Sequence, residues 1–152
     1  AARLHADGSP HAKALPTMLA QLDQLESAVG QIDMVIGHND LLAANILDDG
    51  DKLWLIDWEY GGFNSPLFDL AGLASNNALS ETQERAMLSQ YFETDPDKHW
   101  RAYSAMKCTS LMRETLWSMT SEIHSELDVD YAAYTSENMD RLTSALADFA
   151  QT

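Results

Sequence analysis

The stretch VIGHNDLLAANILDDGDKLWLIDWEY, residues 35–60, decides how this chain is interpreted. Two short apolar runs in it flank the acidic sequence DDGD at residues 48–51, and Asp-Gly between apolar runs is typical of a β-hairpin turn. We place Leu47 opposite Leu53 in this hairpin. The pattern therefore predicts an antiparallel hairpin over residues 45–57.

This register fixes where three polar side chains lie. Asn45 falls opposite Leu55, and Asp57 lies just past the end of the ladder on the same side as Asn45. Paired strands are only about 5.5 Å apart, so Asn45 and Asp57 are expected to lie close together. Asp40 stands in the short loop before Asn45. Carboxylate and amide oxygens suit a hard cation, and one or two carboxylates plus substrate phosphates is the usual magnesium arrangement. We expect a Mg²⁺ site at the open end of the hairpin, with a second carboxylate beside it.

Phosphoryl transfer to an alcohol requires few protein groups. A carboxylate accepts or orients the hydroxyl proton, oxygen ligands hold the Mg²⁺ that bridges the phosphates, and further groups hold the nucleotide. Asp40 fits the first role and is our catalytic candidate, while Asn45 and Asp57 fit the second. The alternative for each is a local role in capping a turn or a strand end.

The order of these residues resembles a known family. The spacing His-x-Asp-x-x-x-x-Asn at residues 38–45, followed by Ile56-Asp57, resembles the catalytic loop and metal-binding segment of protein-kinase-like small-molecule kinases. These include aminoglycoside phosphotransferases and choline/ethanolamine kinases. Residues 38–41, His-Asn-Asp-Leu, are similar to the choline kinases and their LicA-like bacterial relatives, whereas aminoglycoside enzymes usually show His-Gly-Asp. The resemblance implies ATP as a substrate and Mg²⁺ as the cofactor.

Further matches to the choline/ethanolamine kinases extend the resemblance to residues 30–145. They are residues 56–64, 68–71, 116–118 and 130–132. The last two resemble a segment whose aromatic side chains line the choline pocket. One departure bears on the choice of acceptor: Glu114 stands where choline kinases often carry a second tryptophan, three residues before Trp117.

Other residues in these segments are candidates for supporting the loop or binding the acceptor. His38 resembles a residue that props the loop by hydrogen bonding, and we do not assign it as a base. Glu59 is either a support for the metal ligands or a surface charge. Asp69 begins an apolar helical segment, which predicts a buried carboxylate hydrogen-bonded to the catalytic loop. Four residues are acceptor-binding candidates: Trp58, Tyr60, Asn64 and Trp117. The alternative for Trp117 is a packing role in the hydrophobic core.

The rest of the sequence predicts an α+β fold that is mainly helical. Apolar residues recur at helical spacing in five places, two of them with clear start signals in Ser80-Glu81-Thr82-Gln83 and Asp95-Pro96. The predicted helices are residues 16–30, 68–74, 80–92, one beginning at 95–96, and 131–149. Residues 1–14 show no convincing start signal, and residues 61–66 are predicted to be a turn.

The segment before His38 lacks two features of complete kinases. It contains no glycine-rich phosphate loop and no strand-borne lysine, since Lys13 lies in a helical or irregular stretch. We therefore expect residues 1–152 to be the C-terminal lobe of a protein-kinase-like fold, with the N-terminal nucleotide lobe of the same protein missing. On this expectation the 152-residue chain alone shows no turnover.

Composition narrows the possible partners and location. The net charge of −15, with no basic stripe, argues against nucleic acid and anionic membranes and tolerates a cationic substrate. Cys108 is the sole cysteine, so no internal disulfide can form and a reducing compartment fits. No leader and no apolar run of membrane-spanning length is visible, so we expect a soluble, cytoplasmic protein without membrane insertion.

These observations favour one function over two alternatives. The favoured function is an ATP-dependent kinase of a small-molecule alcohol, cationic in character, with choline or ethanolamine as acceptor. A kinase of thiamine or an aminoglycoside is the first alternative. A pseudokinase-like binding module is the second, and the intact Asp40, Asn45 and Asp57 argue against it.

Overall fold

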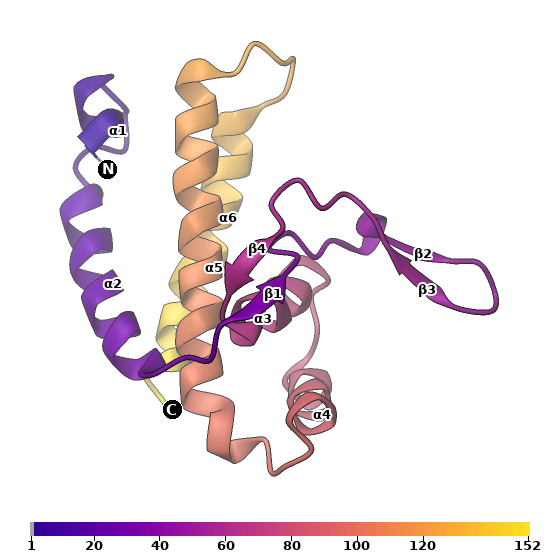
Figure 1. The fold of residues 1–152 in the computed structure, drawn as a ribbon. Coiled ribbons are helices and arrows are strands. Elements are labelled where there is room, and N and C mark those ends of the chain that lie inside the picture. The colour runs from indigo at the N-terminus through magenta and orange to yellow at the C-terminus, as the bar shows by residue number, and fades with distance from the viewer. Residues whose placement is uncertain (1) are drawn as a thin grey trace.

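The computed structural model of this chain describes residues 2–152 and is mainly helical, with short antiparallel strands (Figure 1). The α+β class predicted from the sequence is confirmed. The helices are α1 (Ala2–Ala6), α2 (Leu15–Val29), α3 (Pro66–Asn76), α4 (Glu81–Phe92), α5 (Asp97–His124) and α6 (Tyr131–Phe149). The strands are β1 (Val35–Gly37), β2 (Ile46–Asp48), β3 (Leu53–Leu55) and β4 (Gly62–Asn64), and a 3-10 turn, η1 (Ala43–Asn45), precedes β2.

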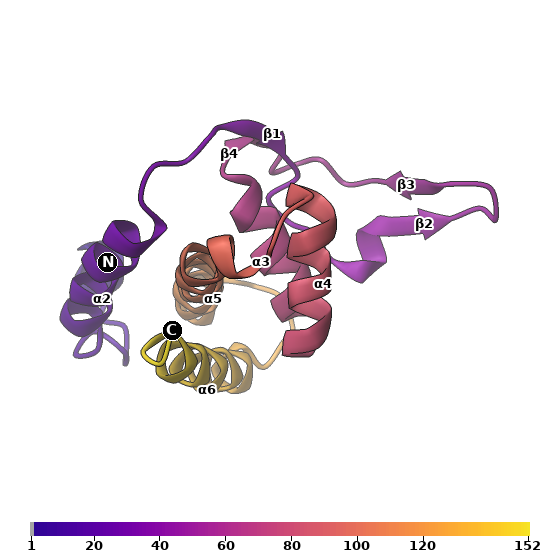
Figure 2. The same ribbon diagram turned by 90° about the horizontal axis from the view of Figure 1, so that it is seen from below.

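The 28-residue helix α5 is the central element of the body. It packs against α2, α3 and α6, and the view from below shows these helices around it (Figure 2). One core cluster joins α2, α5 and α6 through residues such as Leu25, Met112 and Leu142. A second joins α3, α4 and α5 around Leu88 and Tyr103, both fully buried. Helices α2, α3, α4 and α6 therefore each bury apolar side chains against α5.

Most helix ends lie where the sequence predicts them. Gly30 ends α2 with a positive φ of 67°, a conformation that glycine adopts without strain. Before α4, the Ser80 hydroxyl accepts a hydrogen bond from the Gln83 amide and the Gln83 side chain accepts one from the Ser80 amide, so the predicted capping box is confirmed. The bounds of α6 match the predicted 131–149.

Two segments differ from the predictions because of tertiary contacts. Helix α1 forms within residues 1–14, which showed no start signal, and it buries Leu4 in the first core cluster. Strand β4 forms within the predicted turn 61–66 and pairs antiparallel with β1, with Gly37 opposite Gly62. Nothing local marks residues 62–64 as a strand, since their pairing partner lies 25 or more residues earlier in the chain.

The hairpin of β2 and β3 is present, but its predicted register is wrong by one residue. Leu47 lies opposite Trp54 rather than Leu53, and the hairpin projects away from the helical body (Figures 1 and 2). The shorter connection is stabilised within the turn, where the Asp49 carboxylate accepts hydrogen bonds from the amides of Asp51 and Lys52. The Ile56 amide consequently donates to the backbone carbonyl of Asn45, at 3.0 Å.

No helix among residues 2–152 combines the length and the hydropathy that crossing a bilayer requires.

Candidate functional site

The carboxylate of Asp69, in the first turn of α3, binds the backbone of the loop that carries Asp40. Its two oxygens accept hydrogen bonds from the backbone amides of His38, at 2.6 Å, and Asn39, at 2.7 Å. A side chain at Gly37 would place its Cβ only 2.9 Å from one of these oxygens, so the loop approaches α3 as closely as it does because residue 37 is glycine. Asp69 and Gly37 thus fix the start of the loop.

Asn39 sits at the centre of a second set of contacts. Its backbone adopts a positive φ of 63°, which is uncommon for a residue other than glycine. Its side-chain amide donates to the Tyr60 carbonyl, and its side-chain oxygen accepts from the amide of Asn64, at 2.8 Å. From α5, the Arg113 guanidinium donates to the Asn39 carbonyl, at 2.9 Å. The residue before Asp40 is therefore tied both to the segment around β4 and to the central helix.

His38 links this loop to the segment that carries Asp57. The ring is 2% exposed, and its Nε2 lies 2.7 Å from the carbonyl oxygen of Ile56. Because a carbonyl can only accept, Nε2 carries the hydrogen in this contact, while Nδ1 is buried without a hydrogen-bond partner among residues 2–152. The His38 ring also packs against Trp58, with ring centroids 4.8 Å apart. Its contacts are those of a residue that props the loop.

The side chains predicted to bind the metal ion or to accept the proton have oxygens that form no hydrogen bond within residues 2–152. Asn45 is buried, and its side-chain NH₂ donates to the backbone carbonyl of Asp40, at 3.2 Å. Within residues 2–152, no hydrogen bond or ion pair engages the side-chain oxygens of Asp40, Asn45 or Asp57. Asp57 follows Ile56 with a positive φ of 61°, a conformation associated with functional sites. Asp69, by contrast, has both oxygens occupied.

The donor set fits a hard cation that is also bound by a ligand. Across residues 2–152, no three His, Cys, Asp or Glu side chains converge on a metal-binding point. Asn45 and Asp57 offer oxygens that are free of protein partners, and Mg²⁺ commonly takes one or two protein ligands together with substrate phosphates and water. Glu59 is exposed and forms no hydrogen bond within the described chain, so its contacts do not assign it a role.

A cavity of about 400 Å³ opens beside Asp40. Aromatic and charged side chains from α5, α6, the loop before η1 and the segment before β4 line it, among them Asp40, Tyr60, Arg113, Glu114, Trp117, Tyr131 and Tyr134. The ring of Trp117 meets Tyr131 and Tyr134 edge to face, at centroid distances of 5.9 and 6.4 Å. Aromatic faces around a carboxylate suit a cationic ligand.

Within this cavity, Tyr134 and Glu114 form a polar pair. The Tyr134 hydroxyl donates to Oε1 of Glu114, at 2.7 Å. Burial, together with this contact to the Glu114 carboxylate, raises the pKa of Tyr134 above its ordinary value, so the hydroxyl stays protonated and can serve as the donor.

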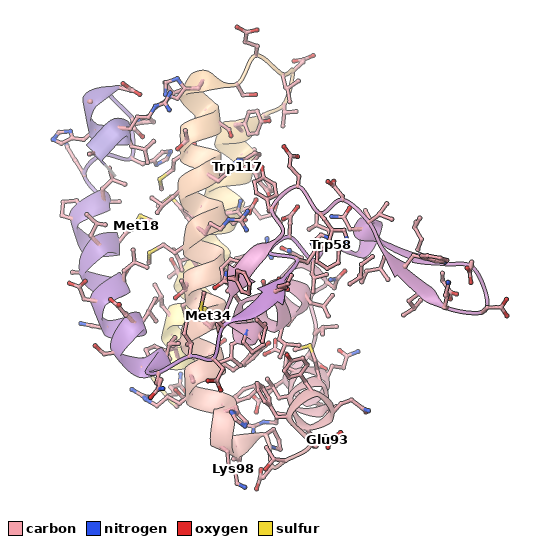
Figure 3. All side chains as sticks on the ribbon, viewed as in Figure 1. Met18, Met34, Trp58, Glu93, Lys98 and Trp117 are labelled. Carbon is pink, nitrogen blue, oxygen red and sulfur yellow. The ribbon has the colours of Figure 1, made fainter. Side chains whose placement is uncertain are left out.

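The four acceptor-binding candidates divide into two groups. Tyr60 and Trp117 line the cavity, and Trp117 is 45% exposed rather than buried in the core. Trp58 lies at the base of the hairpin, where its indole NH donates to the Leu55 carbonyl, and it is not part of the cavity lining (Figure 3). Asn64 is also outside the lining, and its side chain contacts Asn39 and the Ser65 amide instead.

The sequence assigned no site role to Arg113 or Tyr134, and it marked Glu114 only as a departure from the family pattern. Arg113 and Glu114 lie three to four residues before Trp117 on the same helix, a spacing that brings side chains onto one face. That spacing was a usable signal for Glu114 once Trp117 was a candidate. Tyr134 reaches the site only through the α5–α6 packing, which no local pattern encodes.

A larger cavity, of about 560 Å³, lies away from this site between α4, α5 and α6. Its charged lining is mostly paired within the protein: Lys107 with the buried Glu84, and Arg85 with Glu81. These pairs account for its polarity, so we assign it no ligand.

Comparison with known proteins identifies the class. The sequence profile of the choline/ethanolamine kinase family matches residues 7–143. The chain belongs to this family of small-molecule kinases.

Three relatives show the extent of the similarity. Protein LicA of Haemophilus influenzae is 30% identical over 107 residues, which cover 68% of this chain and 40% of LicA. Ethanolamine kinase 2 of Mus musculus is 28% identical over 137 residues, 75% of this chain and 36% of that protein. The crystal structure of choline kinase LicA from Streptococcus pneumoniae superimposes with a TM-score of 0.71 at 26% identity, over 95% of this chain and 50% of that one. The chain thus spans half or less of the length of these relatives.

Proposed function

We propose that the whole protein to which this chain belongs transfers the γ-phosphoryl group of ATP to the hydroxyl of choline or ethanolamine. The observation that carries the proposal is the position of Asp40. Its carboxylate has no protein partner among residues 2–152, and it lines a cavity whose walls are aromatic and acidic. A small amino alcohol bound there would present its cation to the aromatic rings and its hydroxyl to Asp40.

Each residue has a distinct part in this mechanism. Asp40 accepts or orients the proton of the acceptor hydroxyl, which increases the nucleophilicity of that oxygen. Asn45 and Asp57 would hold Mg²⁺, which supplies charge neutralisation for the nucleotide phosphates when bound. Asp69 and His38 position the loop by their hydrogen bonds to its backbone and to Ile56. We propose that residues outside this chain complete the nucleotide site, in the N-terminal lobe expected from the resemblance.

The alternatives predict different acceptors or none. An aminoglycoside or thiamine kinase would use the same loop with another acceptor. The cluster of aromatic rings in the cavity supports a small organic cation instead. A pseudokinase-like module would have no use for unpaired oxygens on Asp40, Asn45 and Asp57, so those free oxygens support a catalytic protein.

The test is an acceptor panel assayed with the whole protein, Mg²⁺ and ATP. We expect phosphorylation of choline or ethanolamine and none of thiamine or aminoglycosides. Asp40→Asn should lower kcat by about 10²-fold or more while leaving nucleotide binding intact. Asp57→Ala should abolish Mg²⁺-dependent nucleotide binding, measured by calorimetry. Phosphorylation of thiamine or an aminoglycoside alone would refute the proposed acceptor, and an unchanged rate in Asp40→Asn would refute the assigned base.

A further inference from the structure

Glu114 lines the acceptor cavity, and one of its carboxylate oxygens has no hydrogen-bond donor among residues 2–152. Its Oε1 accepts the Tyr134 hydroxyl, which fixes the side chain, while Oε2 has no donor among residues 2–152. Glu114 is half-buried and lies one helical turn before Trp117, so it shares a wall with the aromatic cluster. A fixed, partly desolvated carboxylate oxygen is a strong acceptor for a ligand that carries N–H groups.

Glu114 also decides the charge of the cavity. The charged side chains that line it are Asp40, Arg113 and Glu114. The guanidinium of Arg113 is committed to the Asn39 carbonyl, but it remains positive and would offset Asp40. Glu114 therefore gives the cavity its net negative charge. A cation entering the cavity is attracted by Glu114 as well as by the rings of Trp117 and its neighbours.

We propose that Glu114 selects amino alcohols whose ammonium group carries N–H donors over those with a quaternary ammonium. This inference rests on the proposed kinase function. A primary, secondary or tertiary ammonium can donate a charge-assisted hydrogen bond to Oε2 of Glu114. A quaternary ammonium has no N–H. It therefore displaces water from this oxygen and replaces the lost hydrogen bond only with electrostatic attraction. The aromatic rings attract both kinds of cation and do not make the distinction.

The test compares four acceptors that differ only in methylation of the nitrogen: ethanolamine, its N-methyl and N,N-dimethyl derivatives, and choline. With the whole protein and Mg²⁺-ATP, we expect kcat/KM to fall by about tenfold or more at the last step, where the final N–H is lost. Glu114→Gln should lower kcat/KM for ethanolamine by about tenfold and that for choline by less than about threefold, since only ethanolamine loses a charge-assisted bond.

Two control variants separate selection by Glu114 from a structural effect. Tyr134→Phe removes the hydroxyl that fixes Glu114 but keeps the carboxylate, so the preference for N–H acceptors should keep its direction and become smaller. Glu137→Gln makes the same charge change at an exposed position on α6 and should leave all four values unchanged. Circular dichroism melts identify any variant that fails to fold, and the ranking of the four acceptors by the unaltered protein tests the inference without a variant.

The outcomes distinguish this inference from the function on which it rests. Equal kcat/KM for choline and ethanolamine in the unaltered protein would overturn the selection by Glu114 and leave the kinase function intact. Selection by Glu114 would also be overturned if Glu114→Gln lowered kcat/KM for choline and for ethanolamine by the same factor. Phosphorylation of none of the four amino alcohols would overturn the proposed function itself.

Discussion

Replacing Asp69 with asparagine tests how much of the catalytic loop depends on one carboxylate. In the native protein both oxygens of Asp69 accept short hydrogen bonds, from the amides of His38 at 2.6 Å and Asn39 at 2.7 Å. Asparagine offers one oxygen and one NH₂ group, so one backbone amide would face a donor instead of an acceptor. The variant also loses the negative charge that strengthens the remaining bond.

The expected cost follows from those two bonds. A hydrogen bond to a charged group contributes about 1.5–3 kcal/mol, and an amide left without an acceptor costs a similar amount, so Asp69→Asn should lower the free energy of unfolding by about 3 kcal/mol or more. Urea denaturation of the whole protein, followed by tryptophan fluorescence, measures this change, because Trp58 packs on His38 at the loop.

A matched control makes the measurement specific. Asp23→Asn makes the same chemical change at an exposed position on α2, where the side chain accepts no hydrogen bond within residues 2–152, and it should change stability by less than about 0.5 kcal/mol. If Asp69→Asn also changed stability by less than that, the carboxylate would not hold the loop. The kcat of the Asp69→Asn variant should also fall, because Asp40 directly follows the two residues whose backbone amides Asp69 binds.

Three further predictions concern Gly37, Lys107 and Cys108. Gly37→Ala should disturb the same loop, since its Cβ would lie 2.9 Å from the Asp69 carboxylate, and a melting temperature equal to that of the native protein would contradict this. Lys107→Met should cost about 3 kcal/mol in urea denaturation by leaving Glu84 buried without its partner, and Glu84→Gln in the same chain should restore most of that loss. Burial raises the pKa of Cys108 to about 12 from an ordinary 9.0, so the unfolded thiol ionises first and stability should fall as pH rises above about 9. Alkylation of Cys108 at pH 8 in the folded protein, detected by mass spectrometry of its peptide, would contradict its burial.

The helical part of the fold was largely predictable because its signals are local. The Ser80 capping box, the Gly30 stop and the bounds of α6 depend on residues a few positions apart, and all three lie where expected. The register of the hairpin was missed by one residue because side-chain hydrogen bonds within the turn, made by Asp49, set the length of the connection. Hydrophobic pattern alone does not carry that information.

The candidate site was predictable only where its residues lie close together in sequence. The loop around Asp40 and the hairpin end at Asp57 come from one continuous stretch, and the hydrogen bond from His38 to the Ile56 carbonyl links these two segments. The cavity beside Asp40, by contrast, joins Tyr60 to Trp117 and Tyr134, which meet through the packing of α5 against α3 and α6. Trp58 and Asn64 were grouped with the acceptor by sequence proximity, and their contacts run to His38 and Asn39 instead.

The central helix α5 carries two neighbouring residues that serve different parts of the site. Arg113 reaches the backbone just before Asp40, and Glu114 reaches into the acceptor cavity. A rotation or sliding of this helix would therefore displace the cavity wall at Glu114 and the backbone contact next to Asp40 together, and in the same direction. One continuous helix therefore keeps the cavity wall and the loop that carries Asp40 in a constant relative position.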